Sequence, residues 1–102
     1  MVVVHTRIVV APPKRESFEA YIHDAVETAR RKPGSLAYDF GWDIVDPNTM
    51  IGVQIWESMA AYEAHRNSPE HKTQFGGGRE RGLLRAEVTR CEGASFQLPA
   101  EA

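Results

Sequence analysis

The sequence has one cysteine and none of the common metal-binding motifs. Cys91 stands alone among 102 residues, so the chain can form neither an internal disulfide nor a thiolate metal cluster. There is no HExxH pair, no CxxC pair and no acidic calcium loop, and His65 and His71 fall on either side of a predicted helix break. We therefore predict no bound metal ion.

The sequence also lacks an excess of basic charge and a long hydrophobic run. Twelve Lys and Arg residues against fourteen Asp and Glu residues give a formal net charge of −2, whereas nucleic-acid binders usually carry a clustered basic field. No apolar run approaches the ~20 residues that a membrane helix needs. Residues 1–5 lack the basic region of a signal peptide. We predict a cytoplasmic protein that binds neither nucleic acid nor a membrane.

The length of the chain suits one small domain. Hydrophobic residues make up 42% of the sequence and charged residues 25%, which is ordinary for a globular domain. A domain of this size hides only about two-thirds of the surface that its unfolded chain exposes, so covering a remaining apolar face with a partner stabilises it. We predict a domain over residues 1–93 and a loose C-terminal tail over residues 94–102.

Hydrophobic periodicity predicts a strand, a helix and a second strand in the first half of the chain. Residues 2–10 are rich in β-branched side chains and end at two prolines, as a strand does. A helix is predicted from Lys14 to the Lys32-Pro33-Gly34 stop, because apolar residues recur at three- and four-residue steps. Strict alternation over residues 36–44 predicts a strand with one large apolar face, formed by Leu36, Tyr38, Phe40, Trp42 and Ile44.

The second half predicts a hairpin, two short helices and a last strand. Asp46-Pro47-Asn48 is typical of a turn, Ser58 suits a helix N-cap, and Ser68-Pro69 suits the start of another helix. The expected ranges are a strand over 50–56, a helix over 59–66, a helix from 68 to the glycines at 76–78, and a strand over 83–91. The order β-α-β-β-α-β is the ferredoxin-like arrangement of an α+β domain, with a four-stranded antiparallel sheet and helices on one face.

This sheet has more apolar surface than two helical regions can cover. The first strand is apolar on both faces, and the third carries apolar residues on the face opposite Trp56, namely Ile51, Val53 and Ile55. An antiparallel sheet that is apolar on both sides must bury its second side. We predict that a second copy of the chain covers it, giving a homodimer.

Three segments in the middle of the chain carry a family signature. Trp56-Glu57-Ser58 is followed by Glu63-Ala64-His65 and then by Ser68-Pro69-Glu70-His71-Lys72. Together they resemble the strongest signature of the antibiotic biosynthesis monooxygenase family, and the segments at 32–36 and 46–48 match it too. The resemblance covers roughly residues 2–92. It implies a dimeric α/β barrel with one pocket per subunit, between the sheet and the helices.

The resemblance also implies which branch of the family to consider. The branch that turns phenolic or quinol substrates into quinones without a cofactor has a Trp and, six residues later, a Tyr in its pocket, which Trp56 and Tyr62 match. Its Asn four residues before the Trp is Gly52 here, and Gln54 could replace that polar anchor. In the haem-degrading branch the axial His and a first-strand Asn correspond to Phe75 and Thr6, and phenylalanine cannot ligate iron.

His65 is the most important candidate residue among the four histidines. His65 suits a general base or a partner for a phenolate, because imidazole titrates near neutral pH, and its alternative is a structural role across the helix joint. Trp56 and Tyr62 have core packing as their alternative. His71, in the first turn of its helix, is interpreted mostly as a capping or surface residue.

These observations predict a small homodimeric oxygenase that uses O₂, without metal, flavin or another cofactor, on a phenolic or quinol-like molecule. The predicted catalytic residues are His65, Trp56 and Tyr62, and the predicted substrate-binding residues are Thr6, Gln54 and Phe75. Two alternatives stay open on the same scaffold. One is an isomerase that moves a proton with His65, and the other is a non-catalytic small-molecule-binding or stress-response domain.

Overall fold

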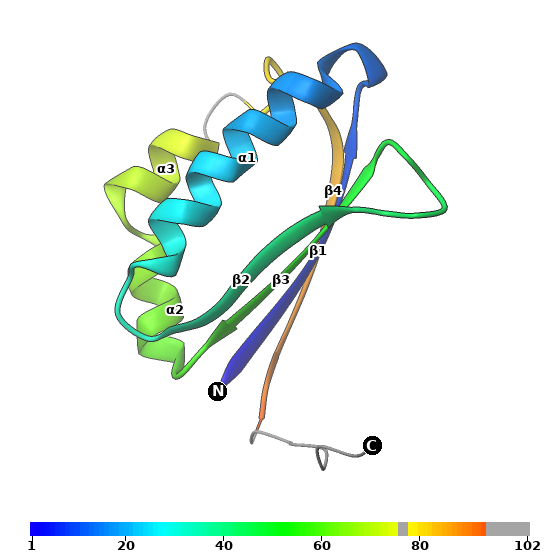
Figure 1. Ribbon diagram of the computed structural model, residues 1–102. Helices are drawn as coiled ribbons and strands as arrows, with labels where there is room; N and C mark the ends of the chain where they lie inside the picture. The colour runs from blue at the N-terminus through cyan, green and yellow to red at the C-terminus, as the bar shows by residue number, and fades with distance from the viewer. Residues whose placement is uncertain (76–77, 94–102) are drawn as a thin grey trace.

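A computed structural model describes residues 1–75 and 78–93, and in this part of the chain a layer of helices packs on a four-stranded sheet (Figure 1). The elements are β1 (Val2–Val10), a 3-10 turn η1 (Pro12–Lys14), α1 (Arg15–Arg30), β2 (Ser35–Trp42), β3 (Thr49–Trp56), α2 (Met59–Arg66), α3 (Pro69–Phe75) and β4 (Leu83–Glu92). This order confirms the ferredoxin-like prediction. The predicted tail at 94–102 and the glycines at 76–77 lie outside the described residues. No described helix is long and apolar enough to cross a membrane.

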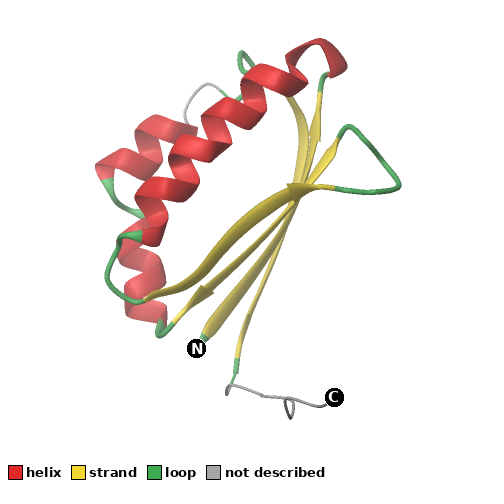
Figure 2. Cartoon of the chain, viewed as in Figure 1, coloured by secondary structure: helices red, strands yellow, loops and turns green. Residues whose placement is uncertain are grey.

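The sheet has the strand order β2-β3-β1-β4, and every neighbouring pair is antiparallel. In the centre, Thr6 of β1 lies opposite Gly52 of β3 and Val88 of β4. Figure 2 shows all the helices on one face of the sheet. The even-numbered residues of β1 therefore face the helices and are buried, while its odd-numbered residues face away from them.

Helix α1 packs on the sheet through the apolar residues whose three- and four-residue spacing predicted the helix. Phe18, Ile22, Ala25 and Ala29 are buried, and polar side chains fill the outer face of the helix. The helix begins at Arg15 because the two prolines and Lys14 form the 3-10 turn before it. Past its end, Gly34 has φ +83°, a conformation in which glycine is favoured, and a Cβ there would lie 2.6 Å from Ala61 Cβ. The backbone at Gly34 therefore packs directly against α2.

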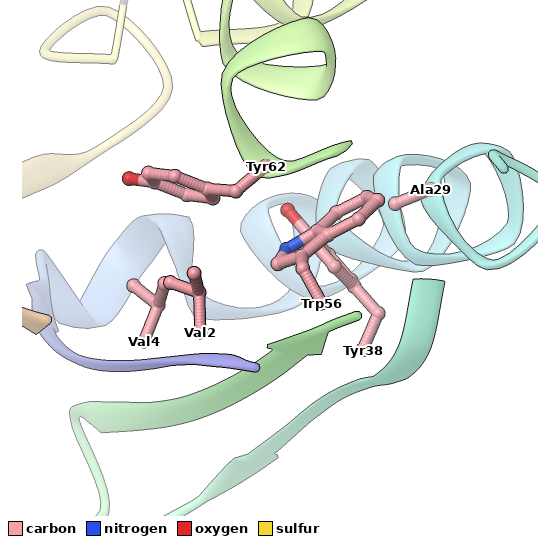
Figure 3. Close-up of a cluster of buried hydrophobic side chains, with 6 residues drawn as sticks. All are labelled: Val2, Val4, Ala29, Tyr38, Trp56 and Tyr62. Carbon is pink, nitrogen blue, oxygen red and sulfur yellow. The ribbon is translucent and has the colours of Figure 1, made fainter. Parts of the chain in front are cut away.

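The core contains two buried clusters along the helix–sheet interface. One is drawn in Figure 3 and consists of Val2, Val4, Ala29, Tyr38, Trp56 and Tyr62. The indole of Trp56 extends toward Ala29 of α1, whereas the ring of Tyr62 extends from α2 over the first strand. The second cluster consists of Ile8, Val10, Phe18, Ile22 and Met50.

The second strand differs from its prediction at both ends. We expected Leu36 and Ile44 on one apolar face, but their side chains are 57% and 99% exposed. The register between β2 and β3 shifts between Ser35 and Ala37, so Leu36 falls in an irregularity that takes its side chain off that face. The strand ends at Trp42, since the Asp43 N–H donates to the Thr49 carbonyl and the hairpin loop begins there.

A glycine in β3 leaves room for an aromatic ring. Phe40 lies directly opposite Gly52 in the register of β2 and β3, and its ring covers the glycine. A Cβ added at Gly52 would lie 2.2 Å from Phe40 Cε1. The position where the quinone-forming branch has its Asn is therefore covered by an aromatic ring, an arrangement known to support glycine in a sheet.

Gly52→Ala should lower the free energy of unfolding by roughly 1–3 kcal/mol, because an extra carbon overpacks this contact. Chemical denaturation of the variant tests this. Gly41→Ala is the matched control, since nothing lies within 4 Å of a Cβ at Gly41. Equal stability of the two variants would contradict the packing argument.

Candidate functional site

A cavity of about 540 Å³ lies between the sheet and the helices, a size that suits a small organic molecule. Its walls come from every strand and from all three α-helices. Most of the described lining is apolar or aromatic, including Val4, Ile8, Phe18, Tyr21, Phe40, Tyr62 and Leu83. A few polar groups converge among these residues.

The cavity brings together four of the predicted site residues. Thr6, Gln54, Tyr62 and His65 all line it, and each is buried. Trp56 is not among the lining residues. The side chain of Phe75 lies outside the described part of the chain.

Aromatic contacts fix the imidazole of His65, which is only 4% exposed. Its ring stacks on Trp56 with 4.7 Å between centroids and 24° between planes. Tyr38 meets it edge-on at 5.5 Å. The ring plane is thus held by two core aromatics, and the nitrogen atoms can point only in defined directions.

Lys32 determines which nitrogen of His65 carries the proton. Its Nζ lies 3.0 Å from His65 Nδ1 and donates to Ser68 Oγ at 2.8 Å, with a carboxylate oxygen of Glu70 at 3.9 Å. An ammonium group has donors and no acceptor, so Nδ1 must accept. The proton therefore sits on Nε2. That atom is buried and has no hydrogen-bond partner among the described residues, so the N–H is an unsatisfied donor beside the cavity that His65 lines.

Ser68 connects Lys32 to the joint between α2 and α3. Its Oγ accepts from Lys32 and from the His71 N–H, and donates to the His65 carbonyl at 2.7 Å. The predicted cap of α3 is therefore confirmed. It also ties the end of α2 to the start of α3, which places the two imidazoles beside each other.

Burial lowers the pKa of His65 to about 3, with further lowering from the charge of Lys32 and from His71. The imidazole is therefore neutral at neutral pH. It is a weak base, but a good hydrogen-bond donor through Nε2.

His71 lies in the site, contrary to our prediction of a capping or surface residue. Its ring meets that of His65 edge-on at 4.5 Å and lines the cavity. Burial, Lys32 and Arg66 lower its pKa. The first turn of α3 thus contributes this side chain to the cavity wall.

Trp56 acts on the cavity through Gln54. The indole N–H, which we expected to orient a substrate oxygen, donates instead to Gln54 Oε1 at 3.0 Å. Because the indole can only donate, the amide oxygen must face it, and the amide NH₂ remains as a further donor at the cavity wall. We therefore assign Trp56 a positioning role, toward both Gln54 and His65.

Sequence reasoning gave Lys32 no role in the site: it interpreted Lys32-Pro33-Gly34 as a helix stop and as part of the segment that resembles the family. The signal was present, since this segment belongs to the family signature. Metal binding has no new support: no group of three or more His, Cys, Asp or Glu side chains comes together in the described ranges.

Stability should fall as the pH is lowered from about 6.5 toward about 3. In that range the unfolded chain takes up a proton at His65 that the folded chain does not, at a cost of up to about 1.4 kcal/mol per pH unit. The free energy of unfolding, measured by urea denaturation between about pH 7 and pH 5, should change less steeply with pH in His65→Gln than in the wild-type protein. His23→Gln, at an exposed position on α1, should keep the wild-type slope. An unchanged slope in His65→Gln would contradict the assignment.

Comparison with known proteins places the chain in a family. The sequence profile of the family described as "Antibiotic biosynthesis monooxygenase" matches residues 1–75. The chain is 32% identical over 68 residues to the uncharacterized protein sll1783 of Synechocystis, a match that covers 67% of this chain and about half, 46%, of that protein. It is 27% identical over 92 residues to YcnE of Bacillus subtilis, whose name describes a candidate monooxygenase, with 90% and 97% of the two chains covered.

A solved structure confirms the fold. The crystal structure of a candidate antibiotic biosynthesis monooxygenase from Deinococcus radiodurans aligns with a TM-score of 0.90, over 98% of this chain and 100% of that chain, at 16% identity. The profile match covers well over half of the sequence. The chain belongs to the antibiotic biosynthesis monooxygenase family.

Proposed function

We propose that this protein is a monooxygenase that uses O₂ to oxidise a small phenolic or quinol-like molecule, without a metal or flavin. The observation that carries the proposal is the buried Nε2–H of His65, which is held by Lys32 on the far side of the ring and has no described protein partner. A phenolate oxygen accepts such a hydrogen bond well. The aromatic lining suits the ring of the same ligand.

The reaction can proceed with substrate and O₂ alone. The phenolate passes an electron to O₂, and the resulting radical and superoxide combine to form a carbon–oxygen bond. Loss of water then leaves the quinone. Overall, a phenol and O₂ give a quinone and water: one oxygen atom enters the ring, the other leaves as water, and four electrons pass from substrate to O₂.

The protein's part in this reaction is to favour the anion and to exclude water. His65 is the partner of the anion rather than the base, because its pKa is lowered and Lys32 occupies Nδ1. Gln54 and Thr6 offer further polar contacts, and Tyr62 and Phe40 provide apolar walls. Donors placed in a buried site stabilise developing charge more strongly than they would in water. The same lowered pKa disfavours an isomerase that would use His65 to carry a proton.

Substitution of His65 separates a donor from a base. His65→Gln keeps a side-chain N–H near the position of Nε2, whereas His65→Leu keeps volume and loses the donor. We expect O₂ uptake with a panel of quinols to fall roughly 10²–10³-fold in the leucine variant, and much less in the glutamine variant. Oxygen-electrode measurements with quantified quinone formation test this.

Equal, large losses in both variants would instead indicate a base. Binding of quinols with no O₂ uptake by the wild-type protein would favour a non-catalytic binding domain.

We also propose that the protein works as a homodimer through the sheet face that the helices leave uncovered. Val53 lies at the centre of that face, opposite His5 of β1 and Asp39 of β2. The same face carries further apolar side chains that are only partly buried within one chain: Val3, Val9, Ile51 and Ile55. Covering such a face with a second copy removes its apolar area from water.

Val53→Asp should convert the dimer to monomer, or prevent folding, because it buries an unpaired carboxylate in the interface. Analytical ultracentrifugation at micromolar concentration tests this. Ala20→Asp, which adds the same charge on the exposed outer side of α1, should stay dimeric. A wild-type protein that sediments as a monomer would overturn the proposal.

A further inference from the structure

The charged groups around the cavity have one sign. Among the described lining residues, Arg66 and Arg90 carry charge, and no carboxylate joins them. His65 and His71 add no opposing charge, because neither can become an anion under ordinary conditions. The charged side chains in the described lining are therefore cationic, although the chain as a whole has a formal net charge of −2.

Both arginines of the lining are exposed to solvent. Arg66 is the last residue of α2, directly after His65, and Arg90 lies on β4 with its guanidinium 5.5 Å from the centre of the Tyr62 ring. Both side chains are exposed, whereas His65 is 4% exposed. In the described part of the chain neither arginine forms an ion pair, unlike Arg7, Arg30 and Arg85.

A ligand that fills this cavity meets two kinds of polar environment. At the buried end it finds the Nε2–H of His65 and the amide of Gln54, which suit a phenolic oxygen. On the side open to solvent it finds guanidinium groups, whose planar donors match a carboxylate: Arg90 lies across β1 from Gln54, and Arg66 follows His65 on α2. The walls between these groups are mainly apolar.

We propose that Arg66 and Arg90 form an anion-binding subsite, and that the substrate is therefore an aromatic acid: a phenol that carries a carboxylate on its solvent-exposed side, away from the hydroxyl group held by His65. This inference rests on the proposed function, because the phenolic end is assigned by the same site. Arg66 and Arg90 are specificity residues here, and the oxidation takes place at the His65 end.

Binding of a matched ligand pair tests the subsite. The probes are a hydroxynaphthoate with hydroxyl and carboxylate at opposite ends, and its primary amide, which has nearly the same shape without the charge. By isothermal titration calorimetry the acid should bind roughly three- to tenfold more tightly than the amide, the range expected for two solvent-exposed ion pairs. The preference should shrink between about 50 mM and about 300 mM salt.

Arg66→Gln and Arg90→Gln should each reduce the preference for the acid and leave binding of the amide nearly unchanged. Arg31→Gln is the matched control. It removes the same charge from an exposed side chain that bonds to the Glu27 carbonyl of its own helix and does not line the cavity. It should keep the wild-type preference.

The outcomes separate this inference from the proposed function. Equal binding of acid and amide, with O₂ uptake in the presence of either, would overturn the anion subsite and leave the monooxygenase proposal standing. A preference for the acid that persists in both arginine variants would also overturn the subsite. If neither probe binds, the anion subsite is wrong, and O₂ uptake with the panel of quinols then decides the monooxygenase proposal separately.

Discussion

The contact between the ammonium group of Lys32 and Nδ1 of His65 joins parts of the chain on which the site depends. Lys32 follows the end of α1, His65 lies near the end of α2, and Ser68 caps α3, so one cation links three helix ends. It also fixes the tautomer of a buried imidazole. Without it, either nitrogen could carry the proton, and the donor that faces the cavity would not be defined.

The second constraint is the unequal coverage of the sheet. The helices pack mainly on β1, β2 and β3, while the residues of β4 beyond Leu83 are exposed. The cavity therefore has a firmly packed side, formed by Trp56 and Tyr38 beneath His65, and an open side, formed by β4. The buried groups that we assign to chemistry lie on the packed side, and the arginine of β4 that we assign to recognition lies on the open side.

Much of this fold could be predicted from the sequence, because apolar residues recur with one period in strands and with a different period in helices. The buried residues of α1 and the caps at Ser58 and Ser68 followed from local patterns. Lys32 and His71 did not, since their roles arise where helix ends meet, and residues 32 and 65 are 33 positions apart. The exposure of Leu36 likewise depends on a register shift between two strands, which alternation along one strand cannot reveal.

The pairing of Gly52 with Phe40 has a consequence for how such pockets diverge. The ring occupies the space that a side chain at position 52 would need. A side chain at position 52 therefore costs less stability when position 40 holds a smaller residue than Phe40, because the contact is otherwise overpacked. The two positions should covary across the family: a large residue at position 40 should accompany glycine at position 52, and a small residue at position 40 should accompany a polar residue at position 52. This pair of residues should then distinguish family members by the shape of the cavity wall that position 40 lines.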